Sequence, residues 1–447
     1  MLLKHGLVVT MNTEREIIED GAVAISGNQI VAVGATASVD PLVQADRTID
    51  MMGKMLLPGF INIHSHAVLT VFRGIAEDGG DHSLYGIMMP IQDILSNHPE
   101  IIYPLSILGL SELVRFGSTT VVENFFGMDY LAPAAVDIGV RAVLSEFSHD
   151  VDLVDIFRKG YRYEQTLGEE TLQRSVDLVE KWHNKAGGRI TCQMSPHAPD
   201  TCSPELLRKI GEEARRMKVG LTAHVGQTPR EIEQMKQMWG CNPVEALAEA
   251  GILGPTFIGA HCIFISPTEM QLMADSGATM AHNPAINAKR GRIAPAVEFR
   301  DMGGNVAIGT DNMHGNIIEA MKIGLHCARV RSQDSTKWQP MDMLEMMTIS
   351  GAKALGMEDQ LGTLEVGKLA DIIAIDLQKP HLYPLTNPIG SFVHYGIGSD
   401  VAWVFIDGQI IVERGELKTV DQEYVLREAQ VASDFALSAL RDLPIHN

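Results

Sequence analysis

Two histidines that lie two residues apart, His64 and His66, are the residues of this chain best suited to metal chemistry. They follow an apolar run at residues 55–63, which is typical of a β-strand. Side chains two apart in a strand point to the same side, so both imidazoles are expected to face one point. Two imidazoles on one side form half of a metal site, and such a site indicates a hydrolase.

Three further polar residues end apolar runs later in the chain: His224, His261 and Asp311. A single histidine is more often a hydrogen-bonded core residue than a metal ligand, so none of the three is convincing alone. Their shared position at the ends of separate predicted strands, together with the first two histidines, is what indicates a common site.

The middle of the chain, residues 58–361, alternates short apolar strands with longer segments of helical periodicity. Eight such strand–helix units predict an α/β protein built on a parallel (β/α)8 TIM barrel, in which functional side chains lie at the carboxyl ends of the strands. A doubly wound open sheet is the structural alternative, although it does not naturally give eight units. The expected strands span residues 60–64, 118–124, 140–146, 189–195, 220–225, 256–262, 278–283 and 305–311.

The two ends of the chain share a different pattern of short β-rich runs joined by tight turns. The pair Asp407-Gly408, between two β-branched runs, predicts a hairpin turn. We therefore expect residues 1–57 and 362–420 to form one small β domain, residues 58–361 to form the metal-dependent barrel, and residues 421–447 to form a C-terminal helical tail.

Neutral imidazoles and one carboxylate suit one divalent metal ion, zinc first, with iron, cobalt or manganese as alternatives. Such an ion would bind water, lower its pKa towards neutrality and hold it over an electrophilic carbon. Asp311 can both ligate the ion and accept the water proton, and His261 can orient the water or complete a second metal site. A second ion usually needs a bridging group on the fourth strand. Residues 189–195 offer Gln193 but no lysine or acid, so we expect one ion.

The 447 residues include 56 acidic and 36 basic side chains, which gives a formal net charge of -20. This balance disfavours nucleic acid and anionic membranes as partners, because both need clustered lysine and arginine. The five cysteines are scattered without a CxxC motif, which is typical of a reducing compartment. No early segment resembles a signal peptide and no apolar run could span a bilayer, so we expect a cytoplasmic protein with a small-molecule substrate.

Eight stretches spread over nearly the whole chain carry a family likeness. They are LPGFINIHSH, RGIAED, MSPHAPDTCS, TAHVGQT, GAHC, AHNPAINAKRGRIAP, AIGTDN and LGTLEVGKLADIIAID. Together they resemble the amidohydrolase superfamily, in the branch that holds triazine hydrolases, guanine deaminases and S-adenosylhomocysteine/methylthioadenosine deaminases. A likeness that runs from the first β segment to the last is far more specific than any single motif.

The resemblance implies a set of residue roles. A metal ion would be bound by His64, His66, His224 and Asp311, with His261 next to the metal-bound water. His197, in SPHAP, would bind substrate, and Asn312, which follows Asp311 directly, is expected near the metal and the substrate. The β segments at both ends match the family's small β-sandwich domain, and relatives that form dimers or tetramers predict a homo-oligomer by analogy.

Position 227 departs from the family pattern. Deaminases of this branch carry a glutamate three residues after the fifth-strand histidine, which moves protons to the ring nitrogen and to the leaving amine. Here that residue is Gln227, and an amide cannot act as a general acid near neutral pH. Glu123, at the end of the second strand, is a candidate proton donor beside the substrate, although an ion pair at the rim suits it better.

The sequence therefore predicts a metal-dependent hydrolase that cleaves a C–N bond in an amino-substituted N-heterocycle, a cyclic amide or a urea. Asp311, His261 and Gln227 are expected at the reaction centre. Two alternatives stay open because of Gln227. A substrate with a sulfur or halide leaving group, such as a thiocarbamate or a chlorotriazine, needs less protonation, and a metal-binding homologue without turnover needs none.

Overall fold

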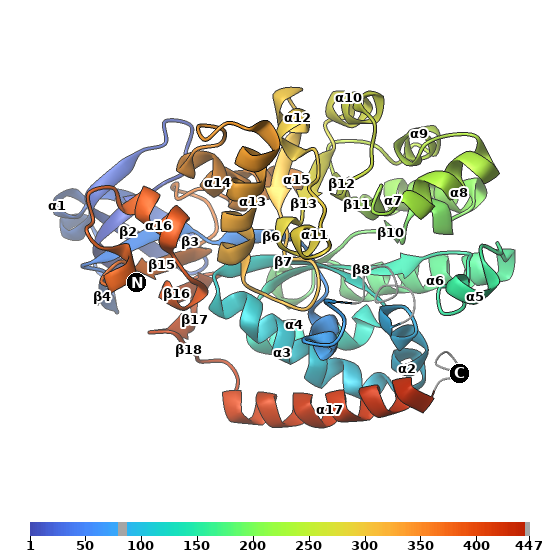
Figure 1. Ribbon diagram of the computed structural model, residues 1–447. Helices are drawn as coiled ribbons and strands as arrows, with labels where there is room; N and C mark the ends of the chain where they lie inside the picture. The colour runs from blue at the N-terminus through green and yellow to red at the C-terminus, as the bar shows by residue number, and fades with distance from the viewer. Residues whose placement is uncertain (79–86, 443–447) are drawn as a thin grey trace.

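The computed structural model describes residues 1–78 and 87–442 as an α/β fold with two parallel sheets at its centre (Figure 1). Isolated parallel bridges, between Ser65 and Asp311 and between Met194 and Leu221, link the two sheets at both edges. The parallel strands therefore follow one another in a closed series, an arrangement consistent with the expected barrel. The first sheet holds β6 (Phe60–Ser65), β7 (Ser118–Phe125), β8 (Arg141–Ser148), β9 (Ile190–Cys192) and β10 (Ser195–Pro196), and the second holds β11 (Leu221–Val225), β12 (Phe257–His261), β13 (Thr279–His282) and β14 (Asn305–Ile308).

The predicted strands of the middle segment appear close to their expected limits, with two differences. The fourth is split into β9 and β10, because the Gln193 N–H still bonds to Leu144 of β8 while the Met194 N–H bonds to Gly220 before β11. Met194 thus bridges to the second sheet between two strands, β9 and β10, that both pair with β8 of the first sheet. The eighth strand, expected over 305–311, ends at Ile308, and Asp311 lies beyond it in a left-handed backbone conformation.

A nine-stranded sheet joins the two ends of the chain. Its order is β18-β17-β16-β15-β5-β1-β2-β3, with β4 paired to β1, so the segments expected to form one β domain do share one sheet. The sandwich form of this sheet and the domain limits at residues 57 and 362 stay predictions. The strands are β1 (Leu2–Val9), β2 (Ile17–Ser26), β3 (Gln29–Ala35), β4 (Thr48–Asp50), β5 (Lys54–Pro58), β15 (Ile372–Asp376), β16 (Val401–Ile406), β17 (Gln409–Glu413) and β18 (Glu416–Leu417).

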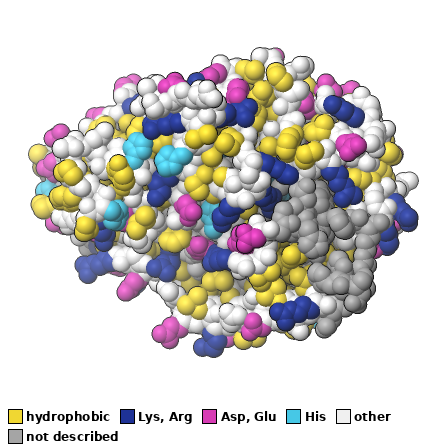
Figure 2. All heavy atoms as spheres, in the orientation of Figure 1, with side chains coloured by type: hydrophobic (Ala, Val, Ile, Leu, Met, Phe, Trp, Pro, Cys, Tyr) yellow, Lys and Arg dark blue, Asp and Glu magenta, His cyan; other side chains and the backbone are white. Residues whose placement is uncertain are grey.

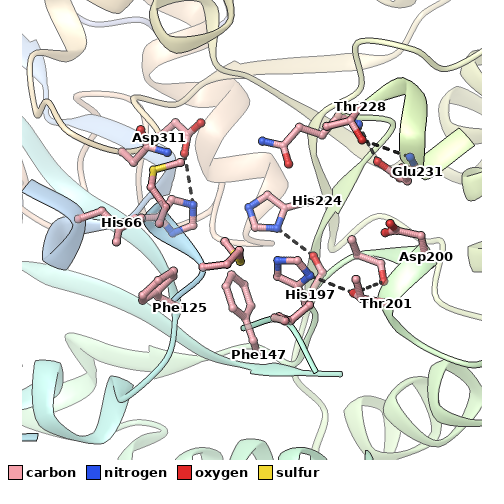
Figure 3. A pocket seen from close by; sticks show the side chains of 17 residues that line it. His66, Phe125, Phe147, His197, Asp200, Thr201, His224, Thr228, Glu231 and Asp311 are labelled. Carbon is pink, nitrogen blue, oxygen red and sulfur yellow. Dashed lines mark hydrogen bonds and ion pairs between the residues drawn. The ribbon is translucent and has the colours of Figure 1, made fainter. Parts of the chain in front are cut away.

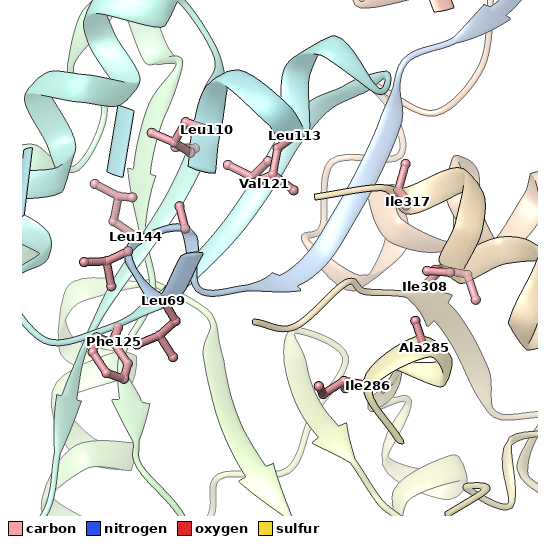
Figure 4. Close-up of a cluster of buried hydrophobic side chains, with 14 of the residues drawn as sticks. Leu69, Leu110, Leu113, Val121, Phe125, Leu144, Ala285, Ile286, Ile308 and Ile317 are labelled. Carbon is pink, nitrogen blue, oxygen red and sulfur yellow. The ribbon is translucent and has the colours of Figure 1, made fainter. Parts of the chain in front are cut away.

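Helices cover the outside of the parallel strands (Figure 1). Leu110 and Leu113, three residues apart on α3, are buried beside Val121 of β7 (Figure 4). Each leucine removed from water in this way stabilises the fold by about 1.5–3 kcal/mol. The helices are α1 (Thr36–Val39), α2 (Ile91–Asn97), α3 (Ile102–Arg115), α4 (Met128–Ile138), α5 (Ile156–Lys159), α6 (Gln165–Trp182), α7 (Pro204–Met217), α8 (Pro229–Trp239), α9 (Pro243–Glu249), α10 (Pro267–Ser276), α11 (Pro284–Lys289), α12 (Ala296–Asp301), α13 (Ile317–Ser332), α14 (Pro340–Met347), α15 (Ile349–Ala354), α16 (Pro388–Tyr395) and α17 (Gln422–Asp442).

The last helix, α17, runs alongside α3 at the outer face of the molecule (Figure 1). It lies within the segment expected to form a helical tail. Residues 443–447, the end of that predicted tail, lie outside the described residues.

Helix α8 begins directly after the loop that follows β11. Thr228 caps its first turn by accepting a hydrogen bond from the Glu231 N–H, and Pro229 occupies the first helical position, where its missing N–H costs nothing. This sharp start fixes the short segment 226–228 between strand and helix.

Acidic and basic side chains are interspersed over the face seen in Figure 2. Within the described part of the chain, none of the helices combines the length and the apolar character that crossing a lipid bilayer requires.

Candidate active site

Five side chains converge where the parallel strands end: His64, His66, His224, His261 and Asp311. The Asp311 Oδ1 atom lies 3.3 Å from His66 Nε2 and 3.7 Å from His64 Nε2, and Oδ2 lies 3.6 Å from His261 Nε2. The ring of His224 lies 5.1 Å from that of His64, between centroids. The structure therefore brings together all the side chains that were expected to share a site.

The backbone is strained at two of these positions. His261 has φ 72° and Asp311 has φ 66°, in the left-handed region that residues other than glycine rarely adopt. Hydrogen bonds hold Asp311 in place, because its N–H donates to the His64 carbonyl at 2.9 Å and its own carbonyl accepts from the His66 N–H at 3.2 Å. The strain, about 1–3 kcal/mol per residue, is retained where it aims side chains at one point.

Three of the histidines contact an oxygen atom outside the cluster through Nδ1. A neutral imidazole that donates from Nδ1 keeps a free electron pair on Nε2, the nitrogen that faces the cluster. The contacts join His66 to the Asn124 carbonyl at 2.6 Å, His224 to the His197 carbonyl at 2.9 Å, and His261 to Asn287 Oδ1 at 3.1 Å.

His64 differs, because neither of its ring nitrogens has a hydrogen-bond partner although the side chain is completely buried. Asp311 Oδ2 also lacks a hydrogen bond. Each unsatisfied buried polar group costs about 1–3 kcal/mol. A cation at the centre of the cluster would contact both groups, so the residues present fit a divalent metal ion.

The protonation states also suit a cation. Burial, together with the neighbouring histidines, holds the pKa of His64 well below its usual value and lowers that of His224 to about 3. Burial lowers the pKa of His261 to about 4 although Asp311 opposes this. Burial acts to raise the pKa of Asp311, but His261 and His66 outweigh it and hold that pKa well below its usual value. At neutral pH, His64, His224 and His261 thus offer neutral nitrogens and Asp311 a carboxylate, which are ligand types of zinc sites.

A cavity opens beside the cluster and is lined by His66, His224 and Asp311 (Figure 3). Part of its wall is apolar, as is usual for sites that bind small molecules. The apolar side chains are Leu69, Met88, Met89, Phe125, Phe147, Leu153 and Ala198.

Gln227 lies where the sequence places it, in the cavity wall beside the cluster. Its Nε2 atom is 3.0 Å from His261 Nε2. Because an amide nitrogen only donates, the His261 nitrogen is the acceptor in this contact. Gln227 therefore directs a hydrogen-bond donor, and no titratable proton, at the centre of the site.

Two of the three predicted substrate residues line the cavity. His197 does so with its Nδ1 held 2.9 Å from Thr201 Oγ1, and Asn312 does so with an unpartnered, buried Oδ1 atom. Glu123 is not among the described lining residues. Its carboxylate accepts hydrogen bonds from Ser65 Oγ at 2.5 Å and from the Ala67 N–H at 2.8 Å, a geometry that favours support of the His64–His66 segment over the predicted contact with substrate.

The residues of the site that are absent from the sequence-based prediction include two acids and one amide: Asp200, Glu231 and Asn287. Asp200 and Glu231 line the cavity, and Asn287 holds His261. Asn287 lies within the family-like stretch AHNPAINAKRGRIAP, which was the only available signal for it. Asp200 and Glu231 lie in a short helical turn and in the first turn of α8, where a polar residue looks solvated.

Comparisons with known proteins agree with this geometry. The model of the amidohydrolase family matches residues 55–411. The chain is 36% identical to the 5-methylthioadenosine/S-adenosylhomocysteine deaminase of Desulforudis audaxviator, over 92% of this chain and 93% of that protein. It is 32% identical to the 5'-deoxyadenosine deaminase of Methanosarcina acetivorans, over 97% and 98% of the two chains.

Solved structures give the same result. An adenosine deaminase from Xanthomonas campestris with bound zinc superposes with a TM-score of 0.90 at 26% identity, covering 98% of each chain. The atrazine chlorohydrolase of Arthrobacter aurescens, complexed with zinc, superposes with a TM-score of 0.88 at 25% identity, covering 97% of this chain and 99% of that one. The chain therefore belongs to the amidohydrolase family, and it is a metal-dependent hydrolase that acts on carbon–nitrogen bonds.

Proposed function

We propose that this protein is an aminohydrolase that releases ammonia from an adenosine-type nucleoside or a related amino-substituted N-heterocycle. The observation that carries the proposal is the cluster of four histidines and Asp311, in which buried His64 has no hydrogen-bond partner on either nitrogen. The relatives named as deaminases of 5-methylthioadenosine, S-adenosylhomocysteine and 5'-deoxyadenosine support the substrate class.

We assign one divalent ion, zinc, to His64, His66, His224 and Asp311. When bound, such an ion supplies Lewis acidity and lowers the pKa of water towards neutrality. Two observations support zinc: the donor set consists of neutral imidazoles and one carboxylate, and two structural neighbours contain zinc. Gln193, in place of an acid or lysine on the fourth strand, supports a single ion.

Asp311 serves in this proposal as ligand and as proton acceptor. Its Oδ1 atom faces His66 and His64, while Oδ2 faces His261 and has no hydrogen bond. Oδ2 is therefore available to take a proton from the attacking water. His261, fixed by Asn287, orients that water, and its Nε2 atom lies within reach of the Gln227 amide.

The substrate ring would lie between apolar and polar walls. Phe125 and Phe147 offer aromatic faces, 5.7 Å apart between centroids, beside the cluster. His197 and Asn312 offer hydrogen bonds to ring nitrogens or sugar hydroxyls.

A second candidate is hydrolysis with release of halide or thiolate. Gln227 favours it, because such a leaving group departs as a stable anion and needs no proton. The similarity to an atrazine chlorohydrolase also supports it.

The remaining parts of the proposal concern the whole chain. We assign the closed series of parallel strands to a (β/α)8 barrel and the nine-stranded sheet to the small β-sandwich. We also propose a cytoplasmic homo-oligomer, by analogy with relatives that form dimers and tetramers.

A substrate panel separates the two candidates. The metal-loaded protein is given adenosine, 5'-methylthioadenosine, 5'-deoxyadenosine, an aminotriazine, and the chloro and methylthio counterparts of the same rings. Ammonia, chloride and thiol release are measured in parallel. Ammonia release from the nucleosides is expected. Release of chloride or thiol alone would favour the second candidate, and no release from any compound would contradict both.

A further inference from the structure

The cavity contains a buried carboxyl group to which the proposed function gives no role. Asp200 lies in the short helical turn Pro199–Thr201, is 4% exposed, and lines the same cavity as His224 and Gln227. Figure 3 shows it between Thr201 and Glu231, on the His197 side of the cavity. A carboxyl group in such a place must either bind substrate, exchange protons with it, or support the loop.

Two tyrosines fix this carboxyl group. The Tyr161 hydroxyl donates to Asp200 Oδ2 at 2.5 Å, and the Tyr163 hydroxyl donates to the Asp200 backbone carbonyl at 2.7 Å. The Tyr161 hydroxyl thus holds the side chain through Oδ2. Other titratable or charged groups that interact with it are Arg230 and Glu231 of α8 and Cys202, which follows the turn; Asp150 acts on Cys202 and Tyr163 as Asp200 does.

The neighbouring acid, Glu231, is already engaged by the backbone. Its two carboxylate oxygens accept hydrogen bonds from the N–H groups of Gly226, at 2.7 Å, and of Gln227, at 2.8 Å. Glu231 therefore shapes the loop that carries Gln227. The N–H groups of that loop thus bond to the carboxylate of Glu231 and leave the carboxyl group of Asp200 to other partners.

The segment that carries Asp200 also positions the cluster. Thr201 Oγ1 contacts His197 Nδ1 at 2.9 Å, and the His197 carbonyl accepts a hydrogen bond from His224 Nδ1 at 2.9 Å. Residues 197–201 thus join the metal centre to the wall where Asp200 lies. A substrate that contacts His197 and His224 therefore occupies the same cavity as Asp200.

We propose that Asp200 is the proton donor to the leaving amine. It would act as the general acid, a role that the amide of Gln227 cannot perform. This inference rests on the proposed aminohydrolase function. Water adds its oxygen to the ring carbon while Asp311 Oδ2 takes one of its protons, the electron pair of the ring C=N bond moves to the ring nitrogen, and Asp311 passes that proton to the ring nitrogen. Protonated Asp200 then donates to the amino nitrogen, the C–N bond breaks with its pair on nitrogen, and ammonia leaves. The Asp200 carboxylate regains a proton from the added hydroxyl as the carbonyl forms.

The acid–base chemistry of the site is consistent with this role. Burial raises the pKa of Asp200 to about 6, although the Tyr161 hydroxyl and Arg230 act against it. Burial and the nearby Asp200 also raise the pKa of Glu231 well above its usual value. A carboxyl group with a pKa near the working pH is a better general acid than one that is fully ionised.

The test is the Asp200→Asn variant, with Asp275→Asn on the exposed face of α10 as a matched control. We expect kcat for ammonia release to fall by about 10²- to 10⁴-fold with little change in KM, while chloride release from the 6-chloro counterpart of the same nucleoside stays near the parental rate. Gln227→Glu in the Asp200→Asn background is expected to restore ammonia release. A raised KM at unchanged kcat would assign Asp200 to substrate binding, and equal losses on both substrates would assign it a structural role; either result overturns the proposal.

A second variant covers the case in which Asp200→Asn does not fold. Tyr161→Phe removes the hydrogen bond that stabilises the Asp200 carboxylate, so the decline of kcat above about pH 6 should move to higher pH. If the decline of kcat occurs at the same pH in Tyr161→Phe as in the parent, the proposal is wrong.

One measurement does not need turnover and so separates this inference from the proposed function. Infrared difference titration of the metal-loaded protein should show a protonated carboxyl band that disappears with a midpoint near pH 6, and that Asp200→Asn removes and Asp275→Asn retains. If the substrate panel gives no ammonia, the proposed function is wrong. The infrared band still shows whether the Asp200 carboxyl group holds a proton. Its absence overturns the assignment of Asp200 as a proton-holding acid.

Discussion

The clustered histidines differ in what holds the ring nitrogen that faces away from the cluster. His66 and His224 bond to backbone carbonyls, whereas His261 bonds to a side chain, Asn287. A backbone contact survives any substitution of the residue that provides it, but the Asn287 contact does not. The orientation of His261 is therefore the part of the centre that a single substitution can release.

Replacing Asn287 with alanine tests this dependence. The His261 ring would lose the Asn287 contact that fixes its tautomer, so we expect kcat/KM to fall by about 10- to 100-fold while metal content stays near parental, because His261 orients water and is not one of the assigned ligands. Metal content after dialysis against a graded chelator and kcat/KM would be measured together. Asn97→Ala, at the exposed end of α2, is the control. Parental values of both quantities for Asn287→Ala would show that His261 needs no such support.

The sequence alone could predict His64, His66, His224, His261 and Asp311 because each lies at or just beyond the end of an apolar run. It could not predict Asn287 or Asp200. Both lie in short helical segments after a strand, and their contacts with His261 and Tyr161 form only when distant segments fold together. The local spacing of residues carries no information about such contacts.

Among the elements, β6 and β7 depend on each other through Glu123. This acid is completely buried on β7, and its carboxylate bonds to Ser65 and Ala67 on either side of His66. Burial raises the pKa of Glu123, and the hydrogen bonds from Ser65 and Ala67 act against this effect. The carboxylate thus ties the end of β6, with its two histidines, to the neighbouring strand.

We expect Glu123→Gln to weaken this link. The amide still accepts from the Ala67 N–H, and Ser65 Oγ can donate to the Val122 carbonyl at 3.1 Å instead, but the bonds to a charged acceptor are replaced by weaker neutral ones at a cost of about 1 kcal/mol. Chemical denaturation should show this loss in the free energy of unfolding, and metal content should fall because His66 is less well held. An unchanged unfolding free energy together with a raised KM would instead support the contact with substrate that the sequence suggested.

The alternation of polar and apolar residues predicted the parallel strands well, but it did not predict the interruption of the fourth strand. The fourth strand reads as continuous over residues 189–195 because polar and apolar residues alternate through it. In the structure it is interrupted after Cys192, where Met194 bridges to Leu221 of the second sheet, before Ser195 and Pro196 pair with β8 of the first sheet again. A change of hydrogen-bond partner leaves no mark on the side-chain pattern, so the sequence could not show it.

At the scale of the whole molecule, a buried ion pair connects the parallel strands to the nine-stranded sheet. Arg141 of β8 bonds to Asp371 at 2.9 and 3.0 Å and also reaches Asp407, at 3.4 Å, in the turn between β16 and β17. The Arg141 and Asp371 side chains are each 3% exposed. The pair thus joins segments more than two hundred residues apart in the chain.

Removal of one partner should be costly. Arg141→Leu leaves the Asp371 carboxylate buried and unpaired, so we expect the free energy of unfolding to fall by about 3–5 kcal/mol. Arg47→Leu, which removes the exposed pair with Glu413, should cost about 1 kcal/mol or less. Urea denaturation of both variants gives the comparison, and equal small losses would mean that the buried pair does not hold the two sheets together.

Acid should destabilise the fold through histidines that are buried as neutral groups. Burial lowers the pKa of His282, on β13, to about 4, whereas an unfolded histidine titrates near 6.5. Between these values the unfolded chain binds more protons, so stability is complete above pH 6.5 and falls as the pH drops towards 4, by about 3 kcal/mol for this residue. His282→Gln should flatten the dependence of unfolding free energy on pH in that window. A slope equal to that of the parent would exclude His282 as a source.

The most direct test of a metal-dependent site is ammonia release from an adenosine-type nucleoside by protein that has been stripped with a chelator and then titrated with Zn²⁺. Inactive stripped protein is expected, with activity that returns and reaches a plateau at one ion per chain. The Asp311→Asn protein should not recover under the same titration. Full activity in the stripped protein, or activity that rises until two ions are bound, would contradict a single ion held by His64, His66, His224 and Asp311.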